Sequence, residues 1–73
     1  MSVKQRKKDT HRVVQVVAED AVPLIESQGY SAPAGDTTIF YGNERECILL
    51  AAEWRIASNF EGVSYRTEPV VPL

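Results

Sequence analysis

The predicted architecture depends most on residues 43–59, which read NERECILLAAEWRIASN. Asn43 is a good N-cap, and Glu46 stands at the third helical position, where an acid completes a capping box. The residues that follow are mostly strong helix formers. Apolar residues also alternate from Ile48 to Ile56, which is a strand pattern, but a strand of this length is unusual in so small a domain. The stretch therefore predicts a helix from Asn43 to Asn59.

This helix has an apolar strip on each of two sides. The first strip consists of Cys47, Leu50, Ala51, Trp54 and Ala57, and the second of Ile48, Leu49, Ala52 and Ile56. A helix that is apolar on two sides needs two apolar neighbours. A chain of 73 residues readily supplies one of them, so the other indicates a second subunit. The residues we expect to mediate self-association are Ile48, Leu49, Ala52, Trp54 and Ile56.

Two short strands are predicted on either side of this helix. Thr37–Tyr41 is rich in β-branched and aromatic residues and follows a loop with Pro, Gly and Ser at residues 30–36. Residues 62–67 alternate in polarity, which is typical of a strand with one buried face. Two strands are too few for an independently stable sheet. Pairing with a second copy would supply four strands, so this is a second reason to expect a homodimer.

Residues 10–28 show the clearest helical periodicity of the chain, with an apolar stripe that runs from Val13 to Ile25. Pro23 interrupts it, so we expect a kink at residues 19–23 or a short second helix from about Ala21. The valines of residues 12–17 favour a strand instead, and this alternative stays open. With the helix adopted, the prediction is a small α+β domain of two helices and two strands, in the order α-β-α-β, completed by homodimerisation.

Charge is distributed unevenly along the chain. Residues 1–12 carry a net charge of +4 and residues 13–73 a net charge of −6. We expect residues 1–8 to be a disordered basic arm, residues 9–68 to form the single domain, and residues 69–73 to be an extended tail.

The sequence shows no recognisable catalytic or cofactor motif. His11 is the only histidine and lies in a charged segment, and Cys47 is the only cysteine and reads as a small buried side chain. We therefore expect no metal site, no cofactor and no enzymatic activity. The chain has no apolar run that would span a membrane and no signal-peptide pattern, so we expect a cytoplasmic protein without membrane contact.

These features favour a protein-interaction module. Its acidic face would meet a partner with a basic surface through Glu19, Asp20, Glu26, Glu44, Glu46 and Glu53. Small acidic inhibitors carried by phages and mobile elements share this size and charge, so an inhibitor of a basic or nucleic-acid-binding partner is one form that this function could take. The alternative is a nucleic-acid-binding accessory protein. Its contacts would come from the basic arm and from Arg12, that is, from Lys4, Arg6, Lys7, Lys8 and Arg12.

Overall fold

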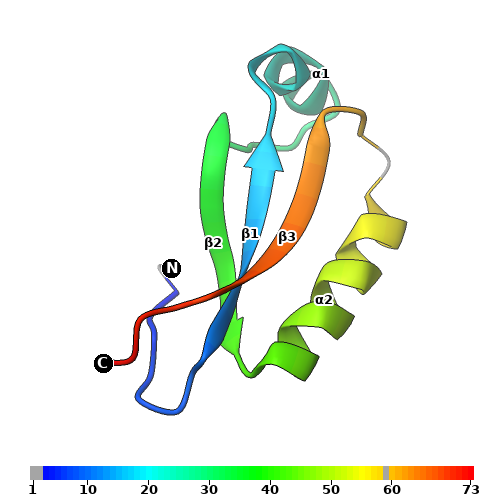
Figure 1. The fold of residues 1–73 in the computed structure, drawn as a ribbon. Coiled ribbons are helices and arrows are strands. Elements are labelled where there is room, and N and C mark those ends of the chain that lie inside the picture. Colours follow the sequence, from blue (N-terminus) through cyan, green and yellow to red (C-terminus); the bar gives the residue numbers. More distant parts are fainter. Residues whose placement is uncertain (1–2, 59) are drawn as a thin grey trace.

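A computed structural model describes residues 3–58 and 60–73 of the chain. The elements follow one another as strand β1 (His11–Val17), the 3-10 helix η1 (Glu19–Ala21), helix α1 (Val22–Ser27), strand β2 (Gly35–Gly42), helix α2 (Glu44–Ala57) and strand β3 (Val63–Pro69). The three strands form one antiparallel sheet in the order β2-β1-β3 (Figure 1). Helix α2 lies along one face of the sheet, and η1 and α1 lie at the end where β1 finishes.

The predicted α-β-α-β order is wrong, because residues 11–17 form the central strand of the sheet instead of a helix. Val13, Val14 and Val17 are all buried, so both faces of this strand are covered. A central strand of this kind reads as a nearly continuous apolar run, which also satisfies a helical wheel. In the structure β1 pairs with β2 on one side and β3 on the other, and this bonding on both edges favours the strand.

The central position of β1 also removes one argument for a homodimer. The sheet obtains its third strand from the chain itself and does not need strands from a second copy. Pro23 takes a position different from the expected kink, since it lies in the first turn of α1, where a missing backbone N–H costs nothing. A short helix therefore does begin near Ala21, as one of the two alternatives predicted.

The other three elements agree with the sequence-based expectations. Residues 35–42 and 63–69 are strands, each a little longer than predicted, and α2 ends two residues before Asn59. The capping box at the start of α2 is complete: the Glu46 backbone N–H donates to Asn43 Oδ1 at 2.8 Å, and the Asn43 N–H donates to Glu46 Oε1 at 3.1 Å. The cap fixes the direction in which α2 leaves the sheet.

The core lies between α2 and the sheet. Val13, Cys47, Ala51 and Tyr65 form one buried cluster, against which Leu50 packs. A second cluster, of Val17, Ala21 and Ile25, joins the end of β1 to η1 and α1. Because the second cluster is set apart from α2, the end of the sheet between α1 and the last turn of α2 is less completely filled.

Candidate functional site

The side of α2 that faces away from the sheet carries an apolar surface. Cys47 and Ala51 face inward, and the residues on the opposite side of the helix are exposed. Ile48 and Leu49 are each about half exposed, Ile56 is 85% exposed, and Ala52 lies between them. We call Ile48, Leu49, Ala52 and Ile56 the outer strip. It is the second apolar strip predicted from the sequence, and nothing in the described part of the chain covers it.

Trp54 does not belong to the outer strip, although it was predicted to take part in self-association. Its ring lies on the sheet side of α2, where it packs edge-on against Tyr65 with 5.8 Å between the ring centroids. It is still 44% exposed, because it faces an open pocket instead of the filled core. Self-association through α2 would therefore use the outer strip without the indole.

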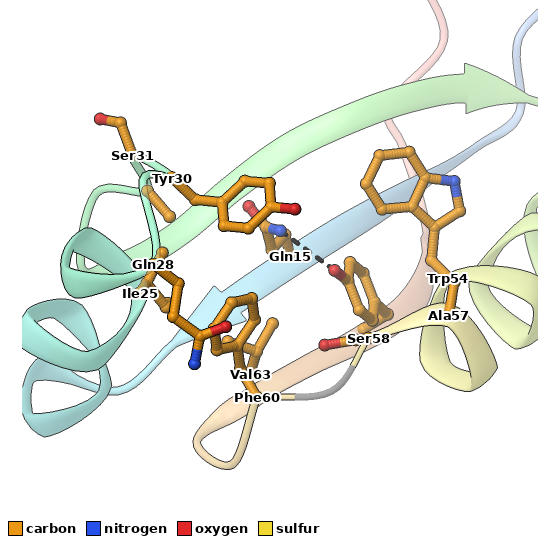
Figure 2. A pocket seen from close by; sticks show the side chains of 12 residues that line it. Gln15, Ile25, Gln28, Tyr30, Ser31, Trp54, Ala57, Ser58, Phe60 and Val63 are labelled. Carbon is orange, nitrogen blue, oxygen red and sulfur yellow. Dashed lines mark hydrogen bonds between the residues drawn. The ribbon is translucent and has the colours of Figure 1, made fainter.

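The pocket lies between α1, the last turns of α2 and the ends of β1 and β3, and has a volume of about 380 Å³. Tyr30, Trp54, Phe60 and Tyr65 line it, and they are four of the six aromatic residues of the chain. Figure 2 shows Tyr30 and Trp54 on opposite sides of the hollow, with Phe60 below. Tyr30 also packs edge-on against Phe60, with 5.8 Å between centroids. We call these four residues the aromatic group.

Uncharged polar side chains complete the pocket. Gln15 rises from β1 and donates from Nε2 to the Tyr65 hydroxyl oxygen at 3.1 Å (Figure 2). Gln28, Ser31 and Ser58 supply further amide and hydroxyl groups at the walls. Since Tyr65 Oη accepts the bond from Gln15, the tyrosine O–H and the Gln15 Oε1 remain as a donor and an acceptor for a bound molecule.

Five of the six acids of the predicted acidic face fall into two groups at opposite ends of the sheet. Glu19, Asp20 and Glu26 lie in η1 and α1, beside the pocket. Glu44 and Glu46 lie at the start of α2, at the other end, where both already have partners within the chain. His11 Nε2 lies 3.2 Å from Glu44 Oε2, and Glu46 belongs to the capping box.

Glu53, the sixth acid of the predicted face, lies in the second half of α2 and is exposed. It neighbours the outer strip and belongs to neither group. The six acids therefore do not form one continuous surface, and none of them lines the pocket.

The basic arm is partly held by acids of the domain. Arg6 donates to both carboxylate oxygens of Asp9, at 3.2 Å and 3.1 Å, and its backbone N–H donates to Asp9 Oδ2 at 2.8 Å. Asp9 is buried, and the bonds from the Arg6 side chain hold its pKa below the ordinary value. In the described residues no ion pair is found for Lys4, Lys7 or Lys8.

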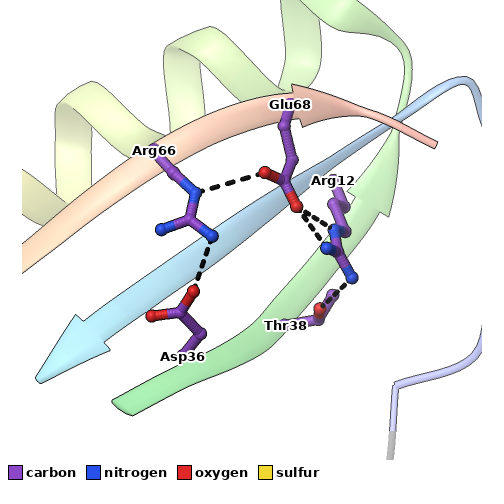
Figure 3. Close-up of polar contacts among 5 residues, drawn as sticks. All are labelled: Arg12, Asp36, Thr38, Arg66 and Glu68. Atoms are coloured by element: carbon purple, nitrogen blue, oxygen red, sulfur yellow. Dashed lines mark hydrogen bonds and ion pairs between the residues drawn. The ribbon is translucent and has the colours of Figure 1, made fainter.

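Arg12 is also engaged, in a network on the sheet face away from α2 (Figure 3). Arg12 Nε donates to Glu68 Oε1 at 2.6 Å, and Arg66 donates to Glu68 Oε2 at 3.2 Å and to Asp36 Oδ2 at 2.6 Å. Hydrogen bonds from Arg12 and then Arg66 lower the pKa of Glu68. We call Arg12, Asp36, Arg66 and Glu68 the charged network. With Arg6 and Arg12 both paired, three of the five predicted cations remain for phosphate contacts.

Neither Cys47 nor His11 lines the pocket. Cys47 is fully buried, and burial raises the pKa of its thiol, which disfavours the reactive thiolate. His11 bonds through Nδ1 to the Thr10 hydroxyl at 2.9 Å and lies at the end of the sheet away from the pocket. Within residues 3–58 and 60–73, no cluster of three or more His, Cys, Asp or Glu side chains is placed to hold a metal ion.

Sequence reasoning missed the pocket. Its lining comes from β1, α1, the loop that follows α1, the end of α2 and β3, so no local spacing marks it. The available signal was that aromatic residues, Tyr30 and Phe60, stand in the loop after α1 and in the segment between α2 and β3.

Comparison of the chain with protein-family models, with curated proteins and with solved structures finds no match. In the described part of the chain, no helix has both the length and the apolar character needed to cross a membrane.

Proposed function

We propose that the protein is a non-enzymatic protein-interaction module that works as a homodimer, joined through the outer strip of α2. The exposed strip carries this proposal: large aliphatic side chains stand on the outside of a well-capped helix, with Ile56 85% exposed. Exposed apolar surface of this kind, bordered by polar residues, marks interaction sites.

The charges beside the strip favour a second copy as the partner. Arg45 lies one turn before Leu49, and Glu53 lies one turn after it. When two α2 helices pack antiparallel with the twofold axis at Leu49, Arg45 of each copy approaches Glu53 of the other. The small side chain of Ala52 beside this axis lets the two helices come close. The surface is therefore complementary to itself, as a twofold interface requires.

The expected dimer is weak. Stable interfaces bury about 800 Å² on each partner. A 14-residue helix is about 21 Å long and presents less than that from one face. We expect a dissociation constant in the range of about 10 to 100 μM, since the ordering costs of association consume much of the apolar gain.

Sedimentation equilibrium between about 5 and 500 μM tests the proposal. Wild-type protein should move from monomer to dimer over this range, and Leu49→Glu and Ile56→Glu should both stay monomeric. Val71→Glu is the matched control, because Val71 is 83% exposed but lies in the C-terminal tail. A wild-type chain that is monomeric at 500 μM contradicts the homodimer.

A charge exchange tests the antiparallel arrangement. Arg45→Glu and Glu53→Arg should each weaken the dimer, because each places like charges together, and the double variant should restore it. A double variant as weak as the two single ones would show that Arg45 and Glu53 do not meet across the interface.

A further inference from the structure

The pocket beside α1 combines aromatic surface with an uncharged lining. Tyr30 is 63% exposed and Trp54 44% exposed, so both rings present surface to the hollow. Each of these rings also makes an edge-on contact, Tyr30 with Phe60 and Trp54 with Tyr65. The face of an aromatic ring carries negative electrostatic potential and attracts cations within about 6 Å of its centroid.

The charged residues near the pocket are mostly acidic, and Arg55, a cation next to Trp54, donates to the Tyr65 backbone carbonyl oxygen at 3.1 Å. The chain has no Lys or Arg between residues 13 and 44. This stretch contains α1 and the loop after it, which carries Tyr30. Glu19, Asp20 and Glu26 all belong to this stretch, and Glu61 follows Phe60 directly. Asp20 Oδ1 lies 3.9 Å from the place that a Cβ on Gly62 would occupy, so its carboxylate stands near the turn that carries Phe60 and Glu61. None of these acids lines the pocket, but acids on the elements next to it raise the local concentration of cations.

The polar groups of the pocket lining indicate which kind of cation the pocket would bind. Gln15 Oε1 and the hydroxyl oxygen of Ser58 are acceptors, which a trimethylammonium group cannot use. A guanidinium is planar, stacks on aromatic faces and donates several hydrogen bonds in its own plane. A volume of about 380 Å³ is near the lower end for ligand pockets and suits a single side chain.

We propose that this pocket binds an arginine side chain from an extended segment of a basic partner protein. The guanidinium would lie between the Tyr30 and Trp54 rings and donate to Gln15 Oε1 at the floor. Glu26 and Asp20 would favour further basic residues beside the arginine. The proposal rests on the role as a protein-interaction module, but it does not depend on the α2 dimer, because the outer strip lies on the other side of that helix.

The test is a fluorescence titration, since Trp54 is the only tryptophan of the chain. The probe is the acetylated and amidated peptide Gly-Gly-Arg-Gly-Gly. In its matched controls the arginine is replaced by citrulline or by lysine. Citrulline keeps the planar shape but has no charge, and lysine keeps the charge but has no planar guanidinium. We expect the arginine peptide to bind with a dissociation constant of about 1 mM, lysine about three- to tenfold more weakly, and citrulline not measurably up to 20 mM.

Variants of residues in and near the pocket test whether the arginine peptide binds there. Tyr30→Ala should weaken the arginine peptide about three- to tenfold without affecting folding, because Tyr30 is largely exposed. The double variant Asp20→Asn, Glu26→Gln should weaken it by a similar factor at low salt and less at high salt, since exposed charges are screened. Ile56→Ser, on the outer strip, should bind as the wild type does, and it also separates this result from dimer formation.

Any of three results would overturn the proposal. The first is the absence of any change in Trp54 fluorescence with 20 mM arginine peptide, when heteronuclear NMR of the same sample also shows no shift at Tyr30 or Gln15. The second is equal binding of the citrulline peptide, which would make the pocket a site for a neutral group. The third is equal binding of the lysine peptide, which would remove the assignment to arginine in particular.

Discussion

The two faces of the sheet are closed by different means. On one face α2 covers Val13, which is fully buried together with Cys47 and Ala51. On the other face Val14 is 1% exposed, although its neighbours there are Arg12, Arg66 and other polar residues. Long charged side chains cover apolar surface with their aliphatic stems while their ends stay in water. A second helix is therefore not needed to bury both sides of β1.

The difference between the faces lies in how easily each one adapts. Because α2 is capped and packed, it cannot move to fill the space left by a smaller core side chain, and a cavity remains. Arginine and glutamate side chains can move, and water can enter beside them. Stability should therefore depend on side-chain volume at the helix-covered face. At the charged face it should depend on pH and on the presence of both members of each ion pair.

The largest expected effect compares two neighbouring valines. Val13→Ala should lower the free energy of unfolding by about 2–3 kcal/mol, because it leaves a cavity under α2. Val14→Ala should cost about 1–1.5 kcal/mol, because the charged side chains can close over the smaller residue. Urea unfolding of both variants, followed by far-UV circular dichroism, measures the two values. Equal losses would contradict the distinction between the faces.

Acid should act next most strongly, through Asp9 and Glu68. Both pKa values are lowered from their ordinary values of 3.8 and 4.5, by bonds from Arg6 to Asp9 and from Arg12 and then Arg66 to Glu68. A lowered folded pKa contributes stability that is present above the unfolded pKa and is lost as pH falls through the folded value. The melting temperature should therefore fall as pH decreases below about 4.5. In the variant Asp9→Asn, Glu68→Gln this fall should be shallower, and a slope equal to that of the wild type would argue against both ion pairs.

Removal of the Glu68 charge by itself should have a smaller effect. Glu68→Gln leaves Arg12 and Arg66 close together on the same face without the carboxylate between them. We expect a loss of stability smaller than half of that in Val13→Ala, because the side chains of the charged network are partly exposed and water replaces part of the interaction. Thermal unfolding at pH 7 and at two salt concentrations measures it. A loss as large as that of Val13→Ala would mean that the charged network, and not packing, holds the sheet together.

The smallest expected effect is on the outer strip. Ile56→Ser should change the free energy of unfolding by less than about 0.5 kcal/mol when measured at low micromolar concentration, where the chain is monomeric. At several hundred micromolar the same change should lower the melting temperature relative to the wild type, because only the wild type gains from dimer formation. If the difference does not depend on concentration, Ile56 acts within the monomer.

Local patterns in the sequence predicted three elements well. The capping box of Asn43 and Glu46, the β-branched run of Thr37–Tyr41 and the alternation after Gly62 each specify an element through neighbours in the chain. The two-sided character of α2 was also readable, since it depends only on helical spacing. Residues 10–17 were predicted wrongly because valines spaced at i, i+1 and i+4 fit both a helical stripe and a strand buried on two faces.

The sequence by itself determined the capped helix, its two apolar strips, the two outer strands and the division of charge between the first twelve residues and the rest. Tertiary structure decided that residues 11–17 are a strand, because that segment gains backbone hydrogen bonds from both β2 and β3 only when the three strands meet. It also decided that Arg12 pairs with Glu68, 56 residues away, and that four aromatic residues from separate segments surround one pocket. These arrangements depend on contacts between distant parts of the chain, which no local spacing encodes.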